Sequence, residues 1–591
     1  MMKYEEKYAE IGESINEYLG ILATTIIQDY VVHNEECNSN IVLNLLGIRD
    51  SDELTTAIKS YIMPKKLIDL DSDEGFLESF INLVDETTMN HFKLLSLKME
   101  NLVLQQQDVP RNKTLSKEEA NELLWKVKNE YIKNLENEVI QYDPEVFLFV
   151  FYGIADRLAI LSHFTRLKAL KQPYPNSVLV DTHLSILTNV IAKMEVNEAI
   201  QTSGHIGREK QFIDIIFNLI YKIYINRKQK DQRSFQTKID FRKIYQLSYM
   251  VTTTNLLLQS NELLYEQGEA LRINDWTFEQ TGDFNGKLQR TLLDIIKFNY
   301  NKNAVEMVFQ EYSKREGFCP NDLLQLAEIS LQANIQAASA QIHLHTFERE
   351  KLKDSIVNIT NVKDFGIDRF LDVLTLKKDI SEIADNANKI SVRPFLELND
   401  GNILFSPLLL LQASYMLETR MLQQSFTTNK KLQKFISKNY DEAFITDLTC
   451  AMEKANVSYL EHVHLDKTSS PYIKELLNFK GITREFDLIF IKENVLYVVE
   501  CKTWKISSFN IVQVLNEQKK ITNSIISHNK AIEIINANPN EFRKLFGEEF
   551  HEYDRIELMM VFQNPTAFKY LNNLGRIKVF SPKGFKDFIE N

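Results

Sequence analysis

The chain has 591 residues, and its 81 Asp and Glu against 69 Lys and Arg give a formal net charge of −12. Seventeen glycines and twelve prolines are few for this length, which argues against a turn-rich β protein and favours long helices. Four scattered cysteines, at 37, 319, 450 and 501, predict neither a zinc site nor a disulfide framework. The length indicates more than one domain.

The longest apolar stretches, such as Val146 to Tyr152, are too short to span a bilayer, and no charged-then-apolar leader opens the chain. We therefore expect no membrane partner. Because nothing indicates disulfides, a reducing cytoplasm is the expected location.

Residues 1–390 predict a large all-helical region that serves as a sensor or assembly module and that divides into one or more subdomains. Ser116 and Glu119 form a capping box at the start of one helix, and Leu123, Val127 and Tyr131 follow at helical spacing. His343 and His345 are expected in a helix, where residues two apart face different directions and make poor joint metal ligands. The expected helices are Tyr4–Val32, Gly75–Gln107, Ser116–Gln141, Pro144–Lys171, Gln211–Arg227, Phe241–Glu266 and Pro320–Glu348.

A hairpin is expected next, with strands Arg393–Leu398 and Ile403–Ser406 joined through Asp400-Gly401, a strong two-residue turn signal. We place the start of the C-terminal domain here, so that it covers residues 391–591. Its core is expected at about 436–591. That core opens with a helix, Tyr440–Asn456, which carries Glu442 near its start, and a strand over Val457–Leu465.

Two apolar strands then carry charge only at their open ends: Arg484 to Ile491 and Val495 to Lys502. If Glu493 and Asn494 form a two-residue turn, residues pair whenever their numbers sum to 987. This register sets Asp487 opposite Glu500. Like charges facing each other across strands are destabilising, and a bound divalent cation removes that cost.

Magnesium fits this patch, because it takes carboxylate and carbonyl oxygens and keeps several waters. The expected ligands of Mg²⁺ or Mn²⁺ in this patch are Asp487, Glu500 and the Cys501 backbone carbonyl. Lys502, two residues from Glu500 and on the same strand face, is expected to orient a water and neutralise a scissile phosphate. Glu485 is either an outer residue that orients these groups or the partner of Lys502.

Asp487 and Glu500 lie thirteen positions apart, and Asp487 with the Glu500-x-Lys502 sequence resembles the signature of the PD-(D/E)XK restriction-endonuclease-like nuclease superfamily. The resemblance covers roughly the last 160 residues. It implies an α/β/α domain with a mixed central sheet, in which a helix that supplies Glu442 as a further metal ligand precedes the hairpin. It also implies phosphodiester hydrolysis by Asp487, Glu500, Lys502 and Glu442.

The elements expected after the motif are a helix over Phe509–Ala537, strands over Ile556–Gln563 and Arg576–Phe580, and a closing helix from Lys583. Residues expected to contact a nucleic-acid backbone are Lys505, Gln513, Gln518, Lys519 and Lys520. From residue 431 onward there are 22 Lys and Arg against 21 Asp and Glu, so the acidic excess lies in the first 430 residues. That balance permits nucleic-acid binding.

The sequence therefore predicts a metal-dependent nuclease, with DNA favoured over RNA, joined to a helical region. By analogy, bacterial restriction and anti-phage defence proteins combine such parts. One alternative is an inactive nuclease fold that only binds nucleic acid or a partner protein. In the other, the helical region oligomerises and the nuclease acts only when clustered.

Overall fold

The computed structural model describes residues 100–169, 196–226, 241–266, 268–281, 302–336, 345–380, 388–422, 427–479, 481–503, 511–547, 550, 552–564 and 577–590. The chain divides into two compact units. The first runs to Asn261 and adds Ala270–Thr281 and Tyr312–Glu418. The second comprises Glu262–Glu269, Gly282–Glu311 and Thr419–Asn591.

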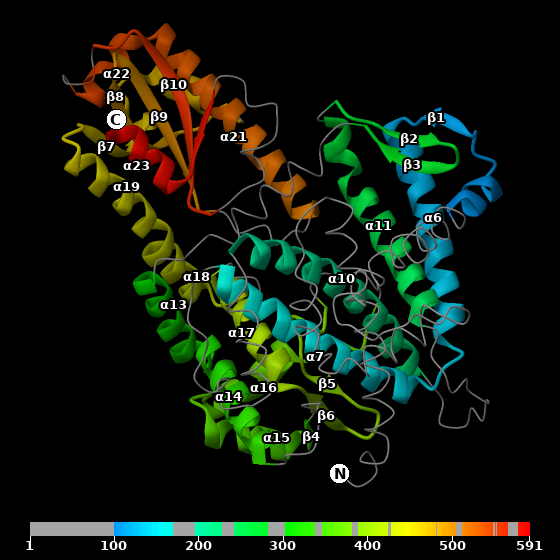
Figure 1. Ribbon diagram of the computed structural model, residues 1–591. Coiled ribbons are helices and arrows are strands. Elements are labelled where there is room, and N and C mark those ends of the chain that lie inside the picture. Colours follow the sequence, from blue (N-terminus) through cyan, green and yellow to red (C-terminus); the bar gives the residue numbers. More distant parts are fainter. Residues whose placement is uncertain are drawn as a thin grey trace, which may run out of the picture. The chain divides into compact units, whose positions relative to one another are not determined.

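Helices dominate the described chain up to Leu422, as the sequence predicts (Figure 1). At the start of α6, the Ser116 hydroxyl accepts from the main-chain N–H of Glu119 and the Glu119 carboxylate accepts from that of Ser116, which confirms the capping box. The predicted segment Tyr4–Val32 and most of Gly75–Gln107 lie outside the described residues. The helices are α6 (Lys117–Val139), α7 (Pro144–Ala169), α10 (Val196–Asn226), α11 (Phe241–Glu266), α13 (Lys302–Arg315), α14 (Pro320–Gln336), α15 (Arg349–Ile359), α16 (Ile367–Leu374) and α17 (Pro407–Leu422).

Two small sheets correct the expectation of an all-helical first region. One has the order β1-β2-β3 and the other the order β4-β6-β5. His345 lies in β4, so the predicted helix over Pro320–Glu348 is wrong at its C-terminal end. The strands are too short to show an alternating pattern, and β1 and β4 pair with distant segments. Their bounds are β1 (Asn112–Thr114), β2 (Leu271–Asn274), β3 (Thr277–Gln280), β4 (His345–Glu348), β5 (Leu396–Glu397) and β6 (Asn402–Phe405).

The hairpin predicted around Asp400-Gly401 is present. Strands β5 and β6 are antiparallel, with Leu396 opposite Leu404, and Gly401 has a φ of 83°, a value that glycine adopts without strain. However, β6 also pairs with β4, so the hairpin belongs to a sheet of the first unit. The division at Thr419 thus lies well after the domain start predicted at residue 391.

The second unit contains a five-stranded sheet of order β11-β10-β9-β8-β7. Strands β7, β8 and β9 are antiparallel neighbours, whereas β10 runs parallel to both β9 and β11, so the sheet is mixed as predicted. The elements are α18 (Lys430–Ile436), a π-helical turn (Ser437–Asp441), α19 (Glu442–Lys454), β7 (Tyr459–His464), α20 (Pro471–Leu477), β8 (Glu485–Lys492), β9 (Val495–Lys502), α21 (Ile511–Ala537), α22 (Pro539–Phe546), β10 (Arg555–Phe562), β11 (Lys578–Phe580) and α23 (Pro582–Glu590).

Helices cover both faces of this sheet, which makes an α/β/α arrangement (Figure 1). On one face, Ile489 and Val498 pack with Ala531 of α21 and Phe542 of α22. On the other face, residues of β8, β9 and β10 pack with residues of α19 and α23. The middle strands are therefore buried on both sides, which explains their continuous apolar sequences.

The predicted register of the β8–β9 hairpin is confirmed from Leu488 to Lys492, but the pairing does not extend to Asp487 and Glu500, which the prediction set opposite each other. Leu488 pairs with Val499 and Lys492 with Val495, so paired numbers sum to 987. Glu493 and Asn494 have φ angles of 53° and 58°, as a type I′ turn requires. In the described part of the chain, no helix has the length and apolarity needed to cross a membrane.

Candidate active site

Strands β8 and β9 part at Asp487. Their pairing runs from the turn to Leu488 and Val499, and beyond it the Cys501 N–H donates to Oδ2 of Asp487 at 2.6 Å. Strand β9 nevertheless stays paired with β10 as far as Lys502, opposite Phe562. The Asp487 carboxylate thus takes the place of a strand carbonyl as acceptor, and the hairpin opens where its charged residues lie.

The Asp487 carboxyl is stabilised in its neutral form. Burial, together with the nearby charge of Glu500, raises its pKa from 3.8 to about 6, although the Cys501 N–H and the charge of Lys502 act in the opposite direction. These influences show that Asp487, Glu500 and Lys502 share one electrostatic patch, as the hairpin register predicts. A carboxyl group with a raised pKa beside a second carboxylate is typical of a functional site.

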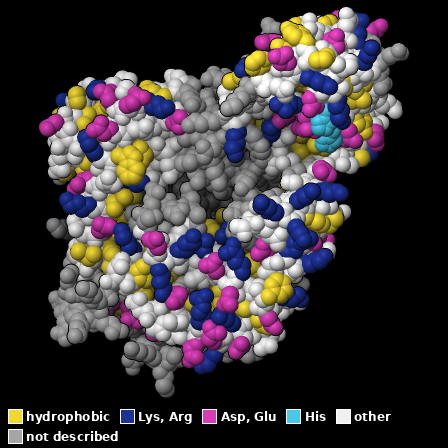
Figure 2. All heavy atoms as spheres, turned by 180° about the vertical axis from the view of Figure 1, so that it is seen from behind, with side chains coloured by type: hydrophobic (Ala, Val, Ile, Leu, Met, Phe, Trp, Pro, Cys, Tyr) yellow, Lys and Arg dark blue, Asp and Glu magenta, His cyan; other side chains and the backbone are white. Residues whose placement is uncertain are grey.

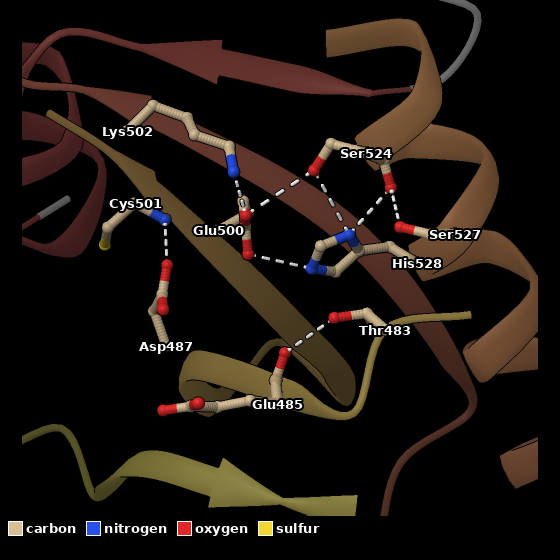
Figure 3. A network of polar contacts seen from close by, with 9 residues as sticks. All are labelled: Thr483, Glu485, Asp487, Glu500, Cys501, Lys502, Ser524, Ser527 and His528. Carbon is tan, nitrogen blue, oxygen red and sulfur yellow. Dashed lines mark hydrogen bonds and ion pairs between the residues drawn. The ribbon is translucent and has the colours of Figure 1, made fainter. Parts of the chain in front are cut away.

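Glu500 is buried, with 9% of its surface exposed, and its carboxylate lies at the centre of a polar network (Figure 3). Oε1 forms an ion pair with Nζ of Lys502, and the Ser524 hydroxyl lies 3.5 Å from the same oxygen. Oε2 lies 2.8 Å from Nε2 of His528. Burial alone would raise the pKa of Glu500, but the His528 and Lys502 contacts outweigh it and lower that pKa.

Besides Ser524, the sequence analysis missed His528 in this network. It lies on α21 with only 2% of its surface exposed, and its ring stacks on Phe486 with centroids 5.8 Å apart. Nδ1 lies 2.7 Å from the main-chain oxygen of Ser524, one helical turn earlier. The spacing of Ser524 and His528 places both on one face of the predicted helix, which is the only sequence signal that they act together.

Glu485 lies on the β7 side of the patch. Its Oε1 is 3.0 Å from Nδ1 of His462, and its Oε2 is 3.8 Å from Nδ1 of His464. Its charge contributes to the raised pKa of Asp487. Lys502 forms its ion pair with Glu500 on its own strand. Glu485 therefore contacts the histidines of β7, whereas the sequence favoured Lys502 as its partner.

Glu442 is the first residue of α19 and its side chain is exposed. Its helix packs on the sheet face that carries Leu488 and Val499, whereas Glu500 contacts α21. Within the described ranges, no three His, Cys, Asp or Glu side chains are grouped to hold a metal ion. Glu442 thus does not join the two carboxylates in the arrangement seen here, and its participation stays a prediction.

The residues predicted to contact nucleic acid lie at or near α21. Lys520 is exposed on this helix. Gln513, Gln518 and Lys519 belong to α21, but their side chains lie outside the described part, as does all of Lys505. On the face shown in Figure 2, Lys and Arg side chains are intermingled with Asp and Glu. On the described part of this face, nucleic-acid binding would therefore depend on local contacts rather than on a broad basic surface.

The two carboxylates keep the capacity to hold a hard divalent cation. A carboxylate has about four lone-pair positions. The Glu500 carboxylate contacts three side chains, those of Lys502, His528 and Ser524. In Asp487, Oδ2 accepts from the Cys501 N–H. Magnesium often binds through one or two carboxylates and keeps its remaining positions for water and phosphate. A pair of acids at an opened strand end fits that preference, and the Cys501 carbonyl stays a predicted third ligand.

Comparisons with known proteins add no relative: no family model, no curated protein and no solved structure matches the chain. Its function is therefore inferred from the chemistry of the site.

Proposed function

We propose that the second unit is a Mg²⁺- or Mn²⁺-dependent nuclease that hydrolyses phosphodiester bonds, with DNA favoured over RNA, in the manner of the PD-(D/E)XK superfamily that its motif resembles. The observation that carries this proposal is the patch at the opened end of β8 and β9. There, a raised-pKa aspartate lies beside a glutamate that is paired with a lysine. Two neighbouring acids, one of which has its pKa raised by the other, are stabilised in their charged forms by a divalent cation.

Each residue has a role that follows from its surroundings. Asp487 and Glu500 hold the cation, which when bound polarises a phosphoryl oxygen. Lys502, held beside Glu500, donates a hydrogen bond to the phosphate and orients the attacking water. Because Lys502 extends from β9, whose pairing with β10 continues to its end, the ammonium group is carried on a rigid strand.

The helical first unit is proposed to sense a target or to bring copies of the chain together. The combination of such a unit with a nuclease is the basis for proposing a role in bacterial anti-phage defence or restriction. If activity needs clustering, specific activity should rise with protein concentration, and light scattering should detect an oligomer at the same concentrations.

A non-enzymatic function is the second candidate, because the Glu500 carboxylate already has both Lys502 and His528 as partners without any cation. A structural ion pair of this kind would suit a domain that only binds nucleic acid or a partner protein. The two candidates differ in whether the purified protein cleaves anything.

The deciding experiment incubates the full chain with single- and double-stranded DNA and RNA, in Mg²⁺, in Mn²⁺ and in EDTA. We expect cleavage that depends on the cation and is lost in Asp487→Ala. An Asp447→Ala variant is the matched control, because Asp447 forms an exposed ion pair with Lys586 elsewhere in the unit. Metal-independent cleavage, or none on all four substrates in the parent, would contradict the proposal.

A further inference from the structure

We propose that His528 is a positioning residue that fixes the Glu500 carboxylate for cation binding. This inference rests on the proposed nuclease function, and it concerns a residue of α21 that the motif does not include. His528 would not touch the cation or the substrate. It would act through Glu500, by setting which of its oxygens faces the open end of the hairpin.

The ring of His528 is held from both sides. Nδ1 faces the Ser524 carbonyl at 2.7 Å, and that carbonyl also accepts from the Ser527 hydroxyl at 2.8 Å. Nε2 lies 2.8 Å from Oε2 of Glu500 (Figure 3). Both ring nitrogens therefore face oxygen acceptors, and the stacked Phe486 restricts the ring plane.

The two carboxylate oxygens of Glu500 have different partners. Oε2 is directed toward the buried helix, whereas Oε1 lies with Lys502, the side chain proposed to meet the phosphate. A carboxylate anchored through one oxygen cannot rotate freely about its terminal bond. Its remaining lone pairs are then presented to the cation in one orientation, which lowers the entropic cost of binding.

A purely structural role is a poor explanation for a polar ring at this depth. An apolar side chain of similar size would stack on Phe486 equally well, without the cost of removing a polar ring from water. The ring nitrogens offset that cost only through their contacts with Ser524 and Glu500. A histidine at this position is therefore explained by its contact with Glu500 rather than by core packing alone.

Two substitutions of similar polarity separate the two ring contacts. The side-chain amide of His528→Gln reaches as far as Nε2 and can donate to Glu500, whereas that of His528→Asn reaches only as far as Nδ1 and the Ser524 carbonyl. His528→Phe keeps the stack on Phe486 and removes both nitrogens. Ile535→Val is the control, because Ile535 is buried on the same helix among apolar residues.

The measurement is Mn²⁺ binding to the full chain by calorimetry without nucleic acid, with cleavage rates taken in parallel. We expect His528→Asn and His528→Phe to bind Mn²⁺ about 10- to 100-fold more weakly than the parent. His528→Gln and Ile535→Val should stay within about threefold of the parent. Thermal unfolding in EDTA shows whether each variant is folded, and if His528→Phe is unfolded, the comparison of His528→Asn with His528→Gln decides.

Two results would overturn the inference, and a third, distinguishable from both, would overturn the proposed function. If the parent binds Mn²⁺ and cleaves, but the Asn and Phe variants bind it as tightly, His528 does not position Glu500. Equal weakening in Gln, Asn and Phe would have the same meaning, because the loss would not follow the donor to Glu500. If the parent neither binds Mn²⁺ nor cleaves, the proposed function itself is wrong.

Discussion

The main-chain N–H of Cys501 donates to the carboxylate of Asp487 across the hairpin, 2.6 Å from Oδ2. This bond uses a side chain where regular strand pairing would use a carbonyl, and it marks the point at which β8 and β9 separate. It also fixes Asp487 close to the start of the Glu500-x-Lys502 segment.

Asp487→Asn should abolish most cleavage while leaving the fold intact. The amide oxygen of asparagine can still accept from Cys501, but the side chain no longer supplies a negative charge to a cation. We expect the cleavage rate to fall at least about 100-fold, since even outer residues around metal ligands cost 10- to 100-fold. Initial rates at saturating Mg²⁺ measure this. A Glu442→Gln variant with an equal loss would show that the third acid also takes part.

Lys502→Met should reduce turnover and spare nucleic-acid binding. It keeps much of the length of the side chain and removes the ammonium group, so we expect a rate loss of about 100- to 10,000-fold, as for other proton-transfer or charge-stabilising groups. Binding measured in Ca²⁺ by fluorescence anisotropy should change by less than about threefold. Lys586→Met, which only breaks the exposed pair with Asp447, serves as control. A parallel loss of binding and cleavage would indicate that Lys502 only attracts the substrate.

The stability of the metal-free protein should depend on pH through Asp487. The pKa of Asp487 rises from its ordinary value of 3.8 to about 6 in the folded protein. Between these pH values the folded state therefore binds more protons than the unfolded state. Stability is therefore lost as pH rises through this window, and the full cost is present above pH 6. The lowered pKa of Glu500 acts in the opposite direction. Because the two carboxylates repel each other, an Asp487 variant without the charge also relieves Glu500, so both effects favour the variant at high pH.

In EDTA at pH 7.5, Asp487→Asn should consequently be more stable than the parent, by on the order of 1 to 2 kcal/mol. The difference should vanish near pH 4. Adding Mg²⁺ should raise the melting temperature of the parent and leave the variant unchanged. Calorimetric scans at several pH values test this. A variant less stable than the parent at pH 7.5 would mean that the neighbouring charges do not destabilise ionised Asp487.

The turn at Glu493 and Asn494 should accept glycine and reject β-branched residues. Both positions have positive φ, which costs an ordinary L-residue about 1 to 2 kcal/mol. Asn494→Gly should be neutral or stabilising by about 0.5 kcal/mol, whereas Glu493→Val should destabilise by about 1 kcal/mol or more. Urea unfolding midpoints report both effects. If Glu493→Val has no effect, the turn has another conformation in solution.

Much of the second unit could be predicted because its signals are local. The helix and strand types follow from short-range patterns, and the register of β8 and β9 follows from a two-residue turn. By contrast, His528 contacts Glu500 from a helix whose position depends on tertiary packing. The only sequence signal for this contact is the four-residue spacing of Ser524 and His528. The partners of Glu485 also come from another strand, β7, whose alignment no turn specifies.

The first unit shows the opposite limit. Its helices follow from apolar periodicity and capping, as Ser116 and Glu119 illustrate. Strand β4 was missed because four residues do not establish a period and its partner, β6, lies more than fifty positions later. The sheet is formed by distant segments whose meeting is not encoded in either one alone.

The parallel pairing of β10 with β9 has a consequence for the order in which the second unit is built. Strand β9 ends at Lys502 and β10 begins at Arg555, with α21 and α22 between them. During synthesis, the hairpin carrying both acids can close through contacts near in sequence, long before its parallel neighbour emerges from the ribosome. Until then the edge of β9 is open to other strands, so premature truncation within α21 should yield an aggregation-prone fragment.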